Sequence, residues 1–154
     1  MLAVAMTAVL IVPAMADPLA FYRWERRPLL VFTPSWGDAR FRRLHRDLDE
    51  SGFMDRDMIR VVISSANVPP DEAVTHGRLR ANAGGKGEGP GSGTALRTRF
   101  GVPPDEFAVI LVGLDGNEKA RWSAPPAPGE LFALIDAMPM RRREMREEGG
   151  EGGE

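Results

Sequence analysis

Two short apolar segments on either side of a helical pattern restrict the possible folds more than any other feature of this chain. Leu29 to Phe32 is an uninterrupted apolar run, typical of a strand covered on both faces. Met58 to Ile63 is rich in β-branched residues, which favour a second strand. Between them, Phe41, Leu44 and Leu48 recur at helical spacing. Because strand–helix–strand crossovers are almost always right-handed, we predict that these two strands lie parallel in one sheet.

The predicted helix has signals at both ends. Thr33-Pro34-Ser35-Trp36-Gly37 interrupts the first strand, and Asp38 is a typical N-cap residue. Gly52 is expected to supply a left-handed C-terminal stop.

The second half predicts a β-hairpin followed by a helix. The segments 107–112 and 118–122 have strand composition and are joined by a tight turn at Asp115-Gly116. Residues 129–137 carry an apolar stripe of helical period, and Pro139 is expected to end or bend that helix.

The middle of the chain is a glycine-rich loop. Six of the eleven residues in the segment 83–93 are glycine, a composition typical of a flexible connection. Leu79 lies in a weakly helical context before this loop, and residues 94–100 predict one or two helical turns after it. The order is therefore β-α-β-(α)-β-β-α, an α/β fold with a mixed sheet and flanking helices, which is the thioredoxin-like arrangement.

The N-terminus predicts export. Residues 2–15 carry no charge, and the run ends in Ala14-Met15-Ala16, so residues 1–16 are expected to be a signal peptide rather than a membrane span. The expected folded domain is 17–145, with a disordered acidic tail at 146–154. On this interpretation the protein is periplasmic or extracellular, without stable membrane insertion after cleavage.

The chain contains no cysteine, which excludes disulfide exchange, cysteine peroxidase chemistry and zinc–thiolate sites. Its 22 acidic and 20 basic side chains give a net charge of −2 and no general reason to bind nucleic acid. His45 and His76 lack metal-ligand spacing, so we expect no metal and no other cofactor.

Four segments resemble a known family: Arg27-Pro-Leu-Leu-Val-Phe32, Met54-Asp-Arg-Asp-Met58, 107–119 and 135–145. They are similar to the uncharacterised domain family numbered 4174, also called the P-DUDES domain. The resemblance covers roughly residues 19–145 and implies a thioredoxin-like fold without established activity. Leu114 departs from the family pattern, which usually has a lysine there.

The resemblance also marks a set of motif residues near the C-terminus and in the hairpin turn. These are Asp115, Gly116, Lys119, Asp136, Met138, Pro139, Met140, Arg141 and Glu144. Lys119 has two possible interpretations, a site residue or a solvated strand charge. The methionines around Pro139 can be explained by helix packing. A weaker hypothesis is that their thioethers bind a soft metal ion.

A candidate binding cleft follows from the fold. Thr33 and Ser35 follow the first strand, where thioredoxin-like proteins hold a reactive thiol, and either capping or ligand binding would explain them. Arg27, Arg56 and Asp57 flank the two parallel strands, where an arginine–carboxylate pair could bind a substrate or close the structure.

Two functions remain open at this point. The first is a non-redox binding or scaffold module of the cell envelope, with a protein or peptide partner. The alternative is a peroxiredoxin-derived enzyme that uses Thr33 or Ser35 together with Arg27 or Arg56, and no catalytic residue is assigned.

Overall fold

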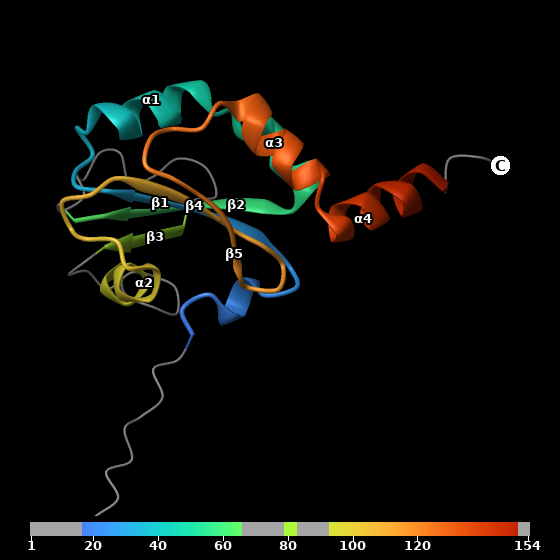
Figure 1. The fold of residues 1–154 in the computed structure, drawn as a ribbon, viewed down its shortest axis with the longest axis horizontal. Helices are drawn as coiled ribbons and strands as arrows, with labels where there is room; N and C mark the ends of the chain where they lie inside the picture. Colours follow the sequence, from blue (N-terminus) through green and yellow to red (C-terminus); the bar gives the residue numbers. More distant parts are fainter. Residues whose placement is uncertain (1–16, 66–78, 83–92, 151–154) are drawn as a thin grey trace, which may run out of the picture.

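Within the described residues, 17–65, 79–82 and 93–150, this computed structural model forms one five-stranded sheet in the order β3-β2-β1-β4-β5 (Figure 1). The strands are β1 (Arg27–Thr33), β2 (Met58–Ser64), β3 (Leu79–Asn82), β4 (Ala108–Val112) and β5 (Glu118–Trp122). The helices are α1 (Ala39–Asp47), α2 (Gly93–Phe100), α3 (Pro128–Asp136) and α4 (Pro139–Gly150). Short 3-10 helices lie at Ala20–Tyr22 (η1), Glu50–Gly52 (η2) and Met54–Arg56 (η3).

The strand pairing confirms the predicted crossover and hairpin. β1 is parallel to β2 along its whole length, from Arg27 opposite Met58 to Thr33 opposite Ser64. β4 is antiparallel to both β1 and β5. The predicted mixed α/β sheet with flanking helices is therefore correct.

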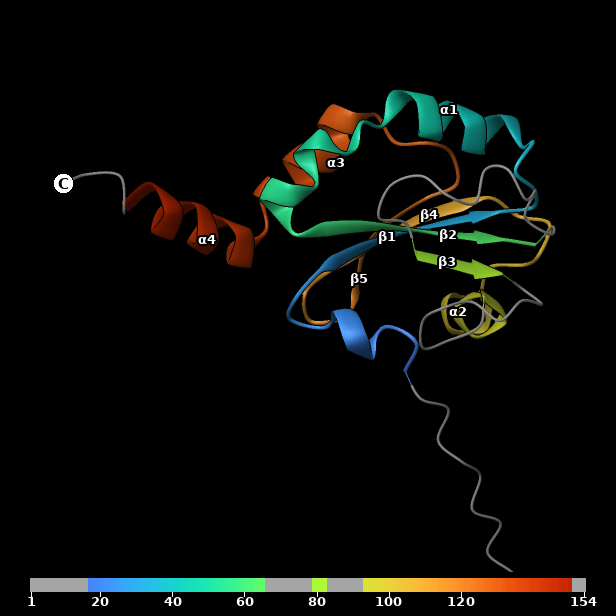
Figure 2. The same cartoon turned by 180° about the vertical axis from the view of Figure 1, so that it is seen from behind.

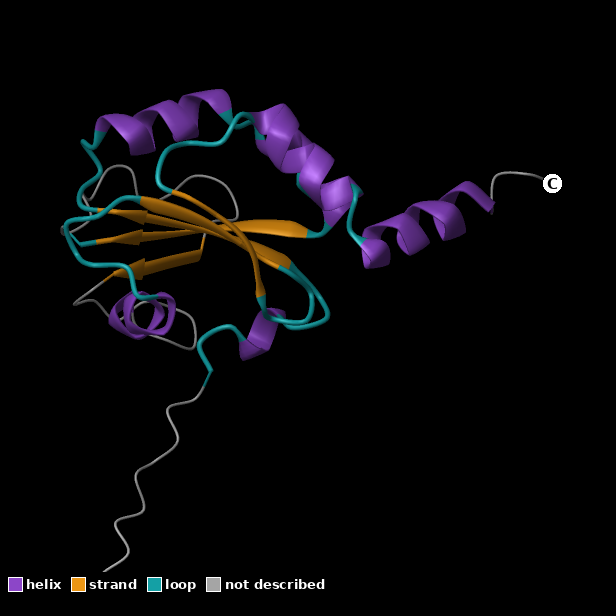
Figure 3. Cartoon of the chain, viewed as in Figure 1, coloured by secondary structure: helices purple, strands orange, loops and turns teal. Residues whose placement is uncertain are grey.

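Alternation along β1 builds a core on each face of the sheet. Leu30 and Phe32 point to the face covered by α2 and η1. Leu29 and Val31 point to the opposite face, covered by α1 and α3. Figure 3 shows these helices on either side of the strands, and Figure 2 shows the same layers from behind. Since all seven residues of β1 are buried, this strand is the centre of the structure.

The helix after β1 begins as predicted but ends differently. The Asp38 carboxylate accepts a hydrogen bond from the Arg40 N–H, which caps α1. The helix ends at Asp47, and the extended residue Leu48 is its C-cap, so Gly52 is not the stop. A Cβ at Gly52 would lie 3.1 Å from the Phe132 ring, so this glycine instead makes room for α3.

Two further predictions need correction. The segment at Leu79 is strand β3, parallel to β2, rather than weakly helical, because it pairs with a neighbouring strand. The disordered tail expected from residue 146 does not begin there, because α4 continues to Gly150. The signal peptide, residues 83–92 of the glycine-rich loop and residues 151–154 lie outside the described residues, and Gly93 already belongs to α2.

Pro139 separates the last two helices. α3 ends at Asp136, as the predicted stop requires, and Pro139 then becomes the first residue of α4. In Figures 1 and 2, α4 extends away from the sheet beyond the end of α3. The α3–α4 junction therefore lies at the edge of the domain, at the end of the sheet where β1 begins.

Candidate functional site

Thr33 and Ser35 lie at the carboxyl end of β1 and make turn contacts. The fully buried Thr33 hydroxyl donates to the Ser35 carbonyl oxygen at 2.7 Å. The same Ser35 oxygen accepts the Asp38 N–H at 3.2 Å. These contacts shape the turn that leads into α1, whose N-cap is Asp38.

A buried arginine that the sequence did not reveal closes this end of the sheet. Arg97, in α2, is 5% exposed and donates to the carbonyl oxygens of Thr33 (3.0 Å), Ile63 (3.1 Å) and Pro103 (2.7 Å). Burial lowers the pKa of this guanidinium. A cation therefore fills the space at the ends of β1 and β2. In the sequence, the only indication that Arg97 is buried is its place between the apolar residues Leu96 and Phe100 of α2.

The other end of β1 holds the remaining cleft candidates. Arg27 is only 1% exposed, and its guanidinium donates to the Arg56 carbonyl oxygen at 2.8 Å and lies 3.9 Å from Asp57. These three residues meet because parallel pairing sets the start of β1 beside the start of β2. Thr33 is six residues along the same strand, about 20 Å away at ~3.3 Å per residue. The structure thus brings Arg27, Arg56 and Asp57 together but not Thr33 or Ser35.

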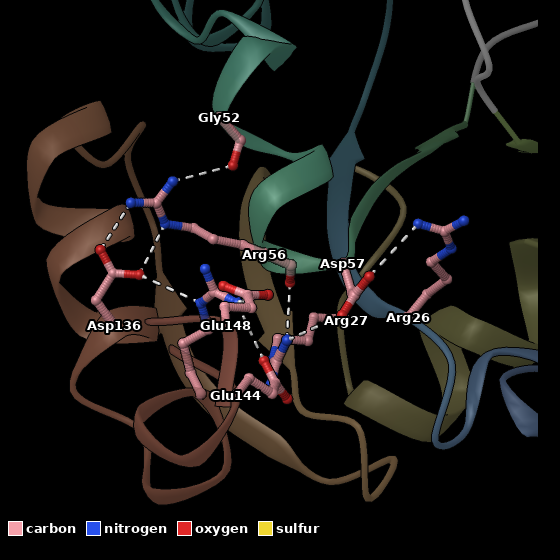
Figure 4. A network of polar contacts seen from close by, with 9 residues as sticks. Arg26, Arg27, Gly52, Arg56, Asp57, Asp136, Glu144 and Glu148 are labelled. Carbon is pink, nitrogen blue, oxygen red and sulfur yellow. Dashed lines mark hydrogen bonds and ion pairs between the residues drawn. The ribbon is translucent and has the colours of Figure 1, made fainter. Parts of the chain in front are cut away.

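The C-terminal motif residues join Arg27 in a chain of alternating charges (Figure 4). Glu144, in α4, accepts from Arg27 at 2.7 Å through one oxygen and from Arg141 at 3.3 Å through the other. Arg141, 6% exposed, lies 3.9 Å from Asp136. Figure 4 shows how β1, η3 and α4 contribute to this network.

Asp136 also completes a two-point ion pair at the end of α3. The Arg56 side chain donates to both carboxylate oxygens, at 2.9 and 2.7 Å, and to the Gly52 carbonyl oxygen at 3.1 Å. Its guanidinium lies 4.6 Å from the centre of the Phe132 ring. This paired geometry fixes the end of α3 against η3.

The network keeps its central carboxylate ionised. Burial alone would raise the pKa of Glu144, but the hydrogen bonds and charges of Arg27 and Arg141 outweigh it and lower that pKa. Glu144 therefore remains an anion that ties α4 to the sheet.

A pocket of about 270 Å³ lies beside this network, at the same end of β1. Arg27 contributes from β1, and Met138, Pro139 and Met140 contribute from the α3–α4 junction. The rest of the lining comes from the β4–β5 hairpin: Gly113, Leu114, Asp115 and Lys119.

An ion pair in the hairpin forms one wall of the pocket. The Lys119 ammonium donates to Asp115 at 2.7 Å, and a Cβ at Gly113 would overlap Lys119 Cε. Glycine at this position therefore lets the pair fold over the backbone. Burial alone would raise the pKa of Asp115, but hydrogen bonds from Lys119 and Asn117 and the charge of Lys119 lower it to about 2.

The motif residues marked by the sequence resemblance therefore cluster in space. Asp115, Lys119, Met138, Pro139 and Met140 line the pocket. Asp136, Arg141 and Glu144 form the adjoining network, and Gly116 makes the hairpin turn with a φ of 79°. Arg27 belongs to both the pocket and the network. The convergence of these segments depends on the tertiary fold.

Among residues 17–65, 79–82 and 93–150, no three His, Asp or Glu side chains are grouped so as to hold a metal ion. In those same ranges, no helix has the length and apolar character needed to cross a bilayer.

The fold and the absence of cysteine together define a thioredoxin-like domain without a redox thiol. Its structure is similar to a DsbF homologue from Corynebacterium diphtheriae, with a TM-score of 0.56, 17% identity and coverage of 78% of this chain and 76% of that one. It is also similar to the reduced 2-Cys peroxiredoxin of Plasmodium vivax, with a TM-score of 0.56, 14% identity and coverage of 81% and 84%. At these identities the likeness concerns the fold.

The family is shown by sequence. The pattern described as "Domain of unknown function (DUF4174)" matches residues 18–144, and the chain belongs to this family. It is 31% identical over 126 residues to the sushi repeat-containing protein SRPX of Rattus norvegicus, covering 81% of this chain and 25% of that protein. It is 39% identical over 51 residues to coiled-coil domain-containing protein 80 of Danio rerio, covering 32% of this chain and 6% of that protein. The chain thus spans a quarter or less of these relatives.

Proposed function

We propose that this chain is an exported, non-redox binding module whose ligand site is the pocket at the start of β1. One observation carries this proposal: motif residues from the hairpin and the α3–α4 junction converge with Arg27 around a single pocket. Concave sites with apolar walls and a few fixed polar groups are the usual form of a ligand site. The partner we envisage is a protein, a peptide or a small molecule derived from one.

The fixed geometry of the pocket supports a binding role. Arg27 is held by Glu144 and by the Arg56 carbonyl oxygen, so its side chain has little freedom to lose when a ligand binds. Lys119 is held by Asp115 over the bare backbone of Gly113. Preorganised polar groups of this kind lower the entropic cost of recognition.

The geometry gives less support to the alternative of a peroxiredoxin-derived enzyme. That hypothesis needs Thr33 or Ser35 to act together with Arg27 or Arg56, and the length of β1 separates the two groups. At the carboxyl end of β1, the Arg97 guanidinium donates to the Thr33 carbonyl oxygen, and the Thr33 hydroxyl donates to the Ser35 carbonyl oxygen.

Export is the second part of the proposal. It is supported by the uncharged apolar run at residues 2–15 and by the small residues Ala14 and Ala16 before Asp17. Fusion of residues 1–30 to a reporter that is active only outside the cytoplasm tests it. Reporter activity is expected, and a silent reporter would remove the compartment from the proposal.

Binding is tested by a screen of chemically diverse fragments, followed by amide chemical shifts in the ¹⁵N-labelled protein. We expect the largest shifts at Gly113, Leu114 and Met140. Met140→Trp should block the pocket, and Met145→Trp is the matched control, since Met145 is a similarly exposed methionine of α4 outside the pocket lining. Fragments that shift other surfaces, or that bind both variants equally, would refute the proposed site.

A further inference from the structure

We infer that the pocket at the start of β1 takes an apolar group that carries a carboxylate, either the C-terminal residue of a peptide or a small free acid. This inference rests on the proposed function, because it names the ligand class of the same site. It follows from the charges, the apolar wall, the helix end and the volume of the pocket.

The apolar part of the ligand is specified by one side of the pocket. Met138, Pro139, Met140 and Leu114 supply its wall. Methionine side chains are flexible and polarisable, so they adapt to branched aliphatic or aromatic groups. Leu114 is 8% exposed and adds a fixed apolar surface beside them.

The carboxylate is specified by the polar groups of the hairpin. The Asp115 carboxylate accepts from Lys119 at 2.7 Å, from the Asn117 side chain at 3.0 Å and from the Asn117 N–H at 3.1 Å. Within the described residues, the Lys119 ammonium uses one of its three N–H donors on this pair. The Asp115 carboxylate therefore already has its hydrogen-bond donors. The Lys119 ammonium, in contrast, has N–H donors left for a ligand oxygen.

The charges in and beside the pocket show which group is left for a ligand. The charged residues of the lining are Arg27, Lys119 and Asp115, two cations against one anion. The nearby carboxylate of Glu144 is already bonded through both oxygens, to Arg27 and Arg141. With Glu144 counted, these charges balance, so the preference for an anionic ligand group comes from the remaining N–H donors of Lys119.

The start of α4 adds to this preference. Pro139 and Met140, the first residues of this twelve-residue helix, form part of the wall. Met138 precedes the helix at the position where Ser, Thr, Asp or Asn would normally accept the free N–H groups, and a thioether is only a weak acceptor. The positive end of the helix dipole thus lies at the pocket.

The volume limits the size of the ligand. At about 270 Å³, the pocket lies just below the range of ~300–1,000 Å³ that is usual for drug-sized ligands. It suits a single large amino-acid residue or an acid of similar size, rather than a nucleotide or a whole cofactor.

The test compares ligands that differ only in the polar end, by calorimetry and amide shifts with the purified protein. The probes are 4-methylpentanoate, 4-methylpentan-1-ol and 4-methylpentan-1-amine, with Gly-Gly-Leu as the free acid and as the C-terminal amide. We expect each acid to bind at least tenfold more tightly than its neutral counterpart, and the amine to bind least. Tighter binding of Gly-Gly-Leu than of 4-methylpentanoate identifies a peptide C-terminus, and the reverse order identifies a small acid.

A variant separates the carboxylate contact from the apolar one. Lys119→Met should remove the preference for acid over alcohol, measured as the ratio of the two dissociation constants. Arg121→Met is the matched control on the same strand, because Arg121 pairs with Glu118 and does not line the pocket. Both variants are first checked for native thermal unfolding.

The failures of the two proposals are distinguishable. If the alcohol, the amine or the amidated peptide binds the pocket as tightly as the acids, the carboxylate inference is overturned and the binding proposal stands. If neither these probes nor the diverse fragments shift the pocket residues, both proposals fail.

Discussion

Arg27 and Glu144 are 117 residues apart in the sequence, yet Arg27 Nη2 donates to Glu144 Oε1 at 2.7 Å. This contact joins the central strand to the last helix, and Met140 at the start of that helix lines the pocket. The Arg27 side chain is 1% exposed and that of Glu144 is 25% exposed, so the pair is shielded from solvent on one side. The position of α4, and hence one wall of the pocket, depends on this pair.

Glu144→Gln should lower the free energy of unfolding by about 2 kcal/mol, because the buried Arg27 loses the carboxylate at 2.7 Å and keeps only Asp57 at 3.9 Å. Urea-induced unfolding measures the loss. Glu147→Gln, an exposed change on the same helix, should cost less than about 0.5 kcal/mol. The double variant Arg27→Met with Glu144→Met should lose less unfolding free energy than Glu144→Gln, because no buried charge is left unpaired. Equal losses for Glu144→Gln and Glu147→Gln would contradict a stabilising role of the Arg27–Glu144 pair.

Arg97→Lys should lower the free energy of unfolding by about 2–3 kcal/mol. A lysine ammonium cannot reproduce the planar fork that reaches three carbonyl oxygens, so buried acceptors would lose their donors. Chemical denaturation again gives the measurement, with the exposed Arg142→Lys of α4 as the control. Equal stability of the two variants would show that Arg97 does not hold the strand ends together.

The free energy of unfolding should decrease in acid, because the Asp115 carboxylate becomes protonated. Its pKa is about 2 in the folded protein against an ordinary value of 3.8, so the ionised carboxylate stabilises the fold above pH 3.8. This contribution is lost as the pH falls through 3.8 towards 2. Allowing for solvent screening, it amounts to about 1 kcal/mol.

Asp115→Asn isolates that contribution. The difference in unfolding free energy between the native protein and this variant should be present at neutral pH, decrease from pH 3.8 downwards and vanish below pH 2. A difference that is constant with pH would mean that the pKa of Asp115 is not lowered by folding.

Trp24→Asn should raise the melting temperature. Trp24 has a φ of 70°, a left-handed conformation that costs a bulky residue roughly 1–2 kcal/mol and that asparagine tolerates better. Because the side chain is 64% exposed, little packing is lost. Trp24→Val, which places a β-branched residue at the same φ, should lower the melting temperature, and changes of the same sign in both variants would contradict the argument.

The sheet could be predicted from the sequence because its signals are local. The alternation of Leu29, Leu30, Val31 and Phe32 between two covered faces follows from the two-residue period of a strand. Asp38 and the Asp115-Gly116 turn likewise act on their immediate neighbours. β3 was missed because its strand character comes from pairing with β2.

The candidate site was predicted in part, since its members meet only in the fold. Thr33 and Arg27 were grouped as one cleft, although they stand at opposite ends of the same seven-residue strand. The length of the apolar run already implied that separation. By contrast, the bond between Arg27 and Glu144 and the carbonyl contacts of Arg97 needed the packing of distant helices, which no local pattern encodes.

The complete burial of β1 has a consequence for how such a domain can diverge. Seven consecutive residues that face two cores tolerate little substitution, so the strand acts as a rigid spacer between the two ends of the sheet. Changes at the hairpin or the α3–α4 junction can reshape the pocket without disturbing the region that Arg97 fills. The two ends of the sheet can therefore change independently of each other.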